Sequence, residues 1–133
     1  MKQELQQKLY QKYPKIFIQK HLPMQQTAMC WGISCGDGWY DIIDTLCFNI
    51  QARVKSQEIK DPSFVCQATQ VKEKFGGLRF YIYGGDDYIE GLIEMAEDMS
   101  YKICSECGNK SEQPENQSRG WIYTLCTPCK NKT

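Results

Sequence analysis

The clearest pattern along the chain is an apolar stripe that begins at Trp39 and ends at Val54. Its members recur at i, i+3, i+4, i+7, i+8, i+11 and i+15, the spacing of one face of an α-helix: Trp39, Ile42, Ile43, Leu46, Cys47, Ile50 and Val54. A shorter stripe at four-residue spacing predicts a helix over residues 3–13, which Pro14 ends: Leu5, Leu9 and Tyr13. We therefore expect two amphipathic helices in the first half of the chain.

A third helix is predicted after the paired aspartates Asp86 and Asp87. Glu90 stands three residues after Asp87, which is the arrangement of a capping box. The apolar residues that follow predict a buried face: Ile89, Leu92, Ile93, Ala96 and Met99. The other face is acidic, and we interpret it as a solvated surface: Glu90, Glu94, Glu97 and Asp98.

Three segments have the character of β-strands, namely residues 27–35, 64–75 and 78–83. Gly76 and Gly77 separate the last two and predict a tight hairpin turn. Simple alternation across this turn pairs Lys74 with Arg79. Together with the helices, these strands predict an α+β fold, a small antiparallel sheet with flanking helices, over residues 1–100.

The strongest chemical feature is a set of two C-x-x-C pairs at the end of the chain. Eighteen residues separate Cys107 from Cys126, which lies in the range of four-thiolate zinc sites. Four thiolates fill the tetrahedral sphere of the ion, so we expect one structural zinc ion rather than a catalytic one; a pair of redox dithiols is the alternative. The sequence predicts a zinc ribbon or treble-clef-like unit over residues 101–133, packed on the core, with these ligands: Cys104, Cys107, Cys126 and Cys129.

Other reactive groups are sparse. His21 is the single histidine, which excludes every site that needs two imidazoles, and its polar surroundings predict a surface position. The remaining four cysteines show no second metal-ligand spacing, and we interpret them as small buried apolar residues: Cys30, Cys35, Cys47 and Cys66. No nucleophile and base pair stands out, so we expect no catalytic residue and a protein that is not an enzyme.

Charge and hydropathy narrow the classes of partner. Sixteen basic and sixteen acidic residues balance to zero, which disfavours nucleic acid, since affinity for duplexes comes mainly from phosphate neutralisation. The first fifteen residues are polar, and no apolar run approaches the roughly 18 residues of a membrane helix. We therefore expect a cytoplasmic protein with no membrane partner.

The hairpin at residues 71–81 is the first candidate ligand site. Lys72, Lys74 and Arg79 would converge on one face of its two strands, where they would suit a phosphate or carboxylate. Gly76 and Gly77 would let a ligand approach the backbone closely. The alternative is an ordinary solvated hairpin.

The turn at residues 36–40 is the second candidate. Asp37 lies between two glycines and is followed by Trp39 and Tyr40, so these residues could form the rim of a pocket. The alternative is a helix that Asp37 caps and whose Trp39 belongs to the core.

Four segments of the chain resemble a group of small bacteriophage-encoded proteins that are left as uncharacterised. The segments are CGDGWYDIIDTLC (35–47), VKEKFGGLRFYIY (71–83), AEDMSYKICSECG (96–108) and RGWIYTLCTPC (119–129). The resemblance covers residues 13–130. It implies an accessory protein made in the cytoplasm of an infected bacterial host, of the kind that counteracts host defence.

Two functional hypotheses follow. The first is a non-enzymatic protein that sequesters a small anionic, nucleotide-like ligand on the hairpin cations, with Trp39, Tyr40 or Tyr81 stacking on a base. The second is a zinc-ribbon adaptor that binds a host protein or a nucleic acid through residues near the second C-x-x-C pair: Arg119, Trp121 and Tyr123.

Overall fold

The apolar stripe that begins at Trp39 forms the central helix of the fold. The computed structural model describes residues 1–111 and 122–132 of the chain. Helix α2 spans Tyr40–Glu58 and is longer than the stripe, because it continues to the start of the turn before Pro62. Its apolar face is buried, as predicted: Ile42, Ile43, Leu46, Cys47, Ile50 and Val54.

Two further helices flank α2. Helix α1 spans Gln3–Lys12 and α3 spans Asp87–Ser100, both close to the predicted bounds. The cap of α3 is Asp86, whose carboxylate accepts the backbone N–H of Ile89 at 3.0 Å, so the cap lies one residue earlier than the predicted capping box. Arg53 of α2 holds this carboxylate in a 2.9 Å ion pair. The buried face of α3 is confirmed at Ile89, Ile93 and Ala96, whereas Met99 is exposed.

The sheet contains three strands in the order β1-β2-β3. Strands β2 (Cys66–Lys74) and β3 (Gly77–Gly84) form the predicted antiparallel hairpin. Strand β1 (Ile33–Ser34) pairs with β2 in parallel, so the sheet is mixed and the expectation of a purely antiparallel sheet is corrected. The cause is the long crossover through α2, which brings the chain back in the same direction.

The strand predicted over residues 27–35 is reduced to β1. Met29–Trp31 form a short 3-10 helix, and an irregular segment joins it to an earlier 3-10 helix at Ile18–His21. The hydroxyl of Thr27 accepts the N–H of Met29, and Gly32 has a left-handed φ of 75°. Local side-chain bonding and the glycine therefore break the strand before Ile33.

The hairpin turn differs by one residue from the prediction. Phe75 (φ 54°) and Gly76 (φ 80°) are the two central residues, and both have the positive φ that a type I′ turn requires. Lys74 therefore pairs with Gly77, and Lys72 rather than Lys74 pairs with Arg79. The turn begins one residue earlier than predicted, so residues 70–74 of β2 pair with residues of β3 that lie two positions before the predicted partners. Side chains alternate with a period of two, so each cation stays on its predicted face.

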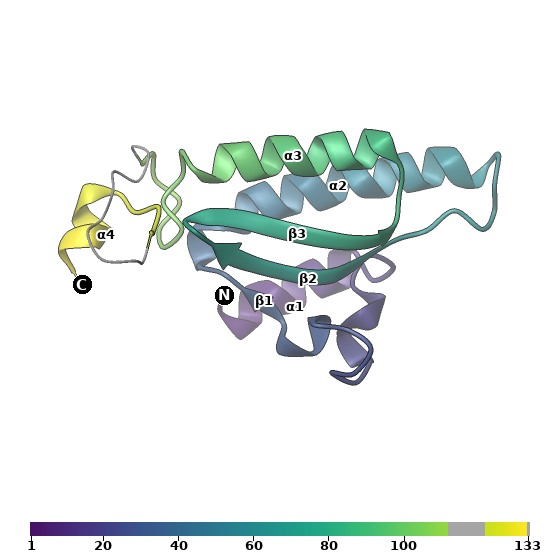
Figure 1. The fold of residues 1–133 in the computed structure, drawn as a ribbon, viewed down its shortest axis with the longest axis horizontal. Coiled ribbons are helices and arrows are strands. Elements are labelled where there is room, and N and C mark those ends of the chain that lie inside the picture. Colours follow the sequence, from purple (N-terminus) through teal and green to yellow (C-terminus); the bar gives the residue numbers. More distant parts are fainter. Residues whose placement is uncertain (112–121, 133) are drawn as a thin grey trace.

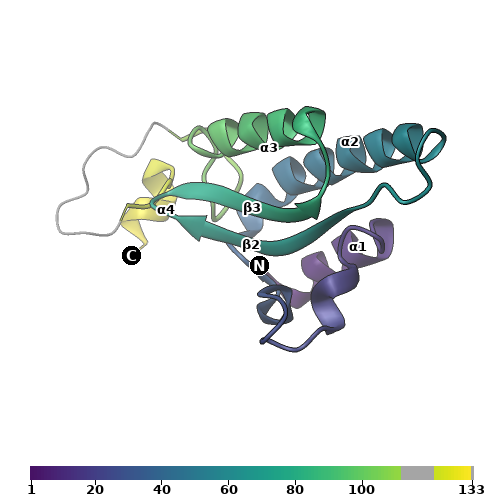
Figure 2. The same cartoon turned by 45° about the vertical axis from the view of Figure 1, so that its right-hand side comes forward.

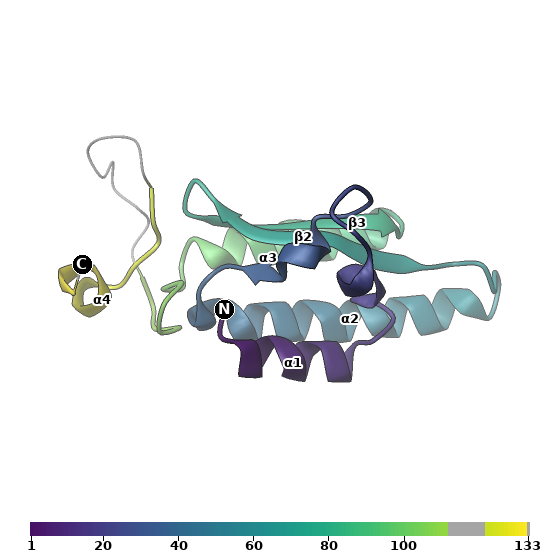
Figure 3. The ribbon, with the colours of Figure 1, turned by 90° about the horizontal axis from the view of Figure 1, so that it is seen from below.

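The elements form two layers (Figure 1). Helices α1 and α2 lie in one layer and the sheet lies in the other, as the view from below shows (Figure 3). Helix α3 runs along the edge of β3, where Ser100 Oγ accepts the N–H of Leu78 at 2.9 Å and Glu97 accepts that of Phe80. Within residues 1–111 and 122–132, none of the α-helices lies over the face of the hairpin that points away from α2 (Figure 3). Among the described residues, no helix has the length and apolar character needed to cross a membrane.

The left-handed conformation of Phe75 gives a stability prediction. A bulky side chain at positive φ is costly, and Asn-Gly is the preferred pair in a type I′ turn. We expect Phe75→Asn to be more stable than Phe75→Ala by about 0.5–1 kcal/mol in urea unfolding, because both variants lose the cation–π contact with Lys74 but only Asn favours the turn. Equal stability of the two variants would contradict this turn geometry.

Candidate metal centre

The two C-x-x-C pairs converge on one point. The four Sγ atoms of Cys104, Cys107, Cys126 and Cys129 all lie within 4.8 Å of one another. Sγ of Cys107 and Sγ of Cys126 are 3.5 Å apart, and neither cysteine is in a disulfide. A tetrahedral ion with Zn–S bonds of about 2.3 Å requires sulfurs about 3.8 Å apart. The cluster can therefore hold a metal ion, and both its size and its donor set fit zinc.

Each pair is shaped by its local backbone. In the first, Gly108 adopts a φ of 81° and donates its N–H to Cys104 O at 3.0 Å, which closes the loop around the sulfurs. An isolated β-bridge between Ile103 and Lys110 supports this loop. In the second, Cys126 is the N-cap of α4 (Thr127–Asn131), a helix of little more than one turn.

The thiols of the cluster are unequal. Burial alone would raise the pKa of Cys104, but backbone N–H groups of Cys126, Cys107 and Glu106 outweigh it and lower the pKa to about 6. Hydrogen bonds shared with the Cys126 and Cys107 sulfurs raise the pKa of Cys129 to about 12. Backbone N–H donors thus favour the thiolate form of Cys104. A metal ion that binds the cluster would have to displace the protons of the other thiols.

The first cysteine loop lies directly against the turn that precedes α2. Gly38 donates its N–H to Ser105 O at 2.8 Å. A Cβ atom built on Gly36 would overlap Ser105 O, and one built on Gly38 would overlap Cys104 O. Only glycine permits so close an approach of two backbones, which explains both glycines of this turn.

Trp39, which belongs to the core, also holds the first cysteine loop against this turn. Its side chain is fully buried, and its indole N–H donates to Ile103 O at 2.8 Å. Trp39 thus has no surface left for stacking on a ligand. Asp37 caps no helix; it accepts the N–H of Lys2 at 2.8 Å and forms an ion pair with the Lys2 ammonium. Tyr40 is half-buried at the start of α2.

The glycines of the hairpin also face the C-terminal unit. Thr124 donates its hydroxyl to Gly76 O at 2.6 Å, and Thr124 O in turn accepts the N–H of Ser105. A Cβ on Gly76 would lie 3.0 Å from Ile122, and one on Gly77 would overlap the Tyr101 hydroxyl. Both glycines therefore accommodate contacts within the protein, and Figure 2 shows this end of the hairpin beside the C-terminal unit. The sequence predicted that a ligand approaches these glycines, whereas in the structure Thr124, Ile122 and Tyr101 approach them.

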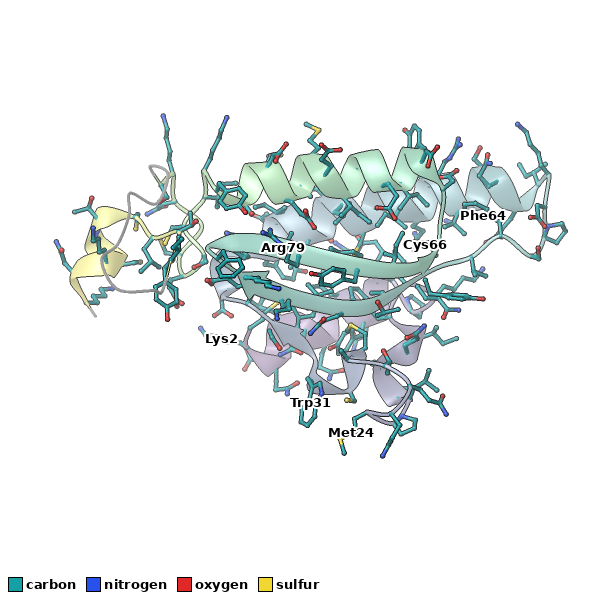
Figure 4. All side chains as sticks on the ribbon, viewed as in Figure 1. Lys2, Met24, Trp31, Phe64, Cys66 and Arg79 are labelled. Atoms are coloured by element: carbon teal, nitrogen blue, oxygen red, sulfur yellow. The ribbon has the colours of Figure 1, made fainter. Side chains whose placement is uncertain are left out.

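The three hairpin cations do share one face. Lys72 is paired with Arg79, and Lys74 is two residues from Lys72 on β2. Arg79 donates to Tyr101 Oη at 3.2 Å and to Leu78 O at 2.9 Å, which orients its guanidinium; Figure 4 labels it on β3. Tyr101 was missed because it lies far from the hairpin in sequence. Both candidate ligand segments contact the C-terminal unit, since Gly38 donates its N–H to Ser105 O and Gly76 O accepts the hydroxyl of Thr124.

The other four cysteines do not belong to the cluster, and three of them are buried. Burial raises the pKa of Cys35 and of Cys66 to about 12 and raises that of Cys47. Cys30 is exposed, so the prediction that it is buried is wrong. His21 is exposed, as predicted. Residues 122–125, which lead to the second C-x-x-C pair, form no regular strand.

Comparison with protein-family models, with curated proteins and with solved structures finds no match to this chain. The metal centre therefore rests on the chemistry and geometry of its own residues.

The close contact between Gly38 and the loop of Cys104 can be tested by substitution. We expect Gly38→Ala to weaken zinc binding by about tenfold or more in chelator competition, because the new Cβ displaces the Cys104 loop. The matched control is Gly91→Ala on α3, where a Cβ meets no atom within 4 Å. This control should retain zinc and gain about 1 kcal/mol of stability. Unchanged zinc affinity in Gly38→Ala would contradict the contact.

Proposed function

We propose that this chain is a non-enzymatic binding protein that one structural zinc ion stabilises and that holds a phosphate-bearing anionic ligand on the hairpin. Thiolates favour soft or borderline ions, and four of them leave no coordination position for water or substrate. This supports a structural role for the ion, since it cannot activate a nucleophile in a closed sphere.

The observation that carries the ligand part is the segregation of charge on the hairpin. Lys72, Lys74 and Arg79 lie on the face with no helix over it. The single acidic residue of the two strands, Glu73, pairs with buried Leu78 and therefore lies on the other face. Within the described part of the chain, none of the three cations forms an ion pair with a carboxylate. This face of the hairpin is therefore positively charged, although the net charge of the chain is zero.

Arg79 is the best placed of the three to recognise a phosphate. Its guanidinium is held by Tyr101 and by the Leu78 carbonyl, so part of its fork is oriented before a ligand arrives. A pre-oriented guanidinium binds phosphate with charge-assisted hydrogen bonds at a lower entropic cost. Lys72 lies directly across the strand pair from it and adds a second positive charge.

The resemblance to phage-encoded proteins extends the proposal to a role. Sequestration of a nucleotide-like signal in the cytoplasm of an infected bacterium would counteract a host defence that depends on that signal. The motif resemblance alone supports this role, and the anion-binding proposal does not depend on it.

A zinc-ribbon adaptor remains the second candidate. Tyr123, close to the second C-x-x-C pair, is 43% exposed and offers a contact for a host protein or nucleic acid. Arg119 and Trp121, which belong to the same hypothesis, lie outside the described residues.

The anion-binding proposal predicts the behaviour of an Arg79 variant. In calorimetric titration with inorganic tripolyphosphate, Arg79→Ala should lose about tenfold to a hundredfold in affinity, since a hydrogen bond to a charged group is worth about 1.5–3 kcal/mol. Lys55→Ala, an exposed lysine on α2, is the control and should bind as the wild type does. Equal affinity of wild type and Arg79→Ala, or no binding to either, would remove the proposal.

A further inference from the structure

We propose that the ligand of the hairpin face is a single-stranded oligonucleotide, whose successive bases stack on Tyr81 and Tyr83 while its phosphates contact Lys72 and Arg79. This inference rests on the proposed anion site and names the chemistry of its ligand.

Two tyrosines follow Arg79 along β3. Arg79, Tyr81 and Tyr83 alternate with inward-facing residues, so all three lie on the face with no helix over it. Tyr81 is 44% exposed and Tyr83 is 61% exposed. Residues two apart in a strand are separated by about 6.5 Å. The strand therefore presents two aromatic rings in series, next to a guanidinium.

The neighbouring strand completes this surface with polar and basic side chains. Gln70 pairs with Tyr81, Gln67 pairs with Tyr83, and Lys72 pairs with Arg79. A bulge at Thr69 widens β2 between the first two of these pairs. None of these residues is acidic, so a polyanion meets no like charge from either strand of the face.

The surroundings border the surface without covering it. The segment before β1 packs at the edge of β2, where Ala28 donates its N–H to Thr69 O and Gln19 donates to Gln67. On the other side, Glu97 and Ser100 of α3 occupy the N–H groups of β3. The edge of β3 is thus closed to an added strand, and the ligand must lie across the face of the sheet.

The mixture of rings and cations selects the class of nucleic acid. In a duplex the bases are stacked on one another, and their faces cannot reach a protein surface. In a single strand each base offers a π-face to an aromatic side chain, and this contact tolerates any sequence. Inorganic phosphate would use the cations and leave both tyrosines without a partner. Two rings in series favour a ligand with at least two successive bases over a mononucleotide.

The test is fluorescence anisotropy with zinc-loaded full-length protein and a labelled oligothymidylate of about twelve nucleotides. We expect binding at low salt, with a slope of log affinity against log salt of about −1.4 for the two phosphate contacts. Tyr81→Ala should weaken binding by about tenfold, and the Tyr81→Ala, Tyr83→Ala double variant by about a hundredfold. Phenylalanine at both positions should preserve affinity, because it retains the rings.

Tyr88→Ala provides the matched control. Tyr88 is 56% exposed but lies on α3 against Arg53, away from the hairpin face. Its removal should leave oligonucleotide affinity unchanged. A zinc count for each variant shows that the fold is intact.

Competition with tripolyphosphate, thymidine monophosphate and duplex of equal length separates the outcomes. Support requires that the single strand binds most tightly and that the alanine variants lose affinity while the phenylalanine variants do not. If the alanine variants bind normally and tripolyphosphate competes as well as the oligonucleotide does, base stacking is refuted and the anion site remains. If neither the oligonucleotide nor tripolyphosphate binds, both this inference and the proposed function fail.

Discussion

The backbone contact between the first cysteine loop and the Gly36–Gly38 turn is the constraint on which the rest of the structure depends. It joins a unit too small to bury a core of its own to the start of the central helix. Because Trp39 donates to Ile103 O from within the core, the position of the loop and the packing of α2 are linked. Thr124 links this loop to the hairpin, because its carbonyl accepts the N–H of Ser105 and its hydroxyl donates to Gly76 O. Metal binding, core packing and hairpin geometry are therefore parts of one assembly.

Local patterns in the sequence predicted the elements that local chemistry determines. The three helices follow from helical periodicity, and the four sulfurs of the cluster follow from ligand spacing. The pairing of the hairpin did not follow, because the turn depends on a left-handed Phe75, a conformation that a bulky residue rarely adopts. The parallel pairing of β1 was missed because two residues, Ile33 and Ser34, carry too short a pattern and depend on a partner far along the chain.

Glycines account for the main difference between the predicted and observed sites. A glycine indicates that something approaches the backbone closely, but the sequence does not state what approaches. At Gly38 and Gly76 it is the C-terminal unit, and this explains why Trp39 is buried rather than placed at the rim of a pocket. The cations required no such inference, since alternation alone places Lys72 and Arg79 on one face, and the structure adds that no helix covers it. Strand alternation also places Tyr83 on that face, two positions beyond Tyr81 on β3.

The central claim is that four thiolates of the C-terminal unit bind one zinc ion. X-ray absorption spectroscopy at the zinc edge of the purified protein tests it most directly, because this method counts the scattering atoms around the metal and measures their distances. The account predicts one zinc ion per chain with four sulfur neighbours at about 2.3 Å. Nitrogen or oxygen neighbours, or fewer than four sulfur neighbours, would contradict it.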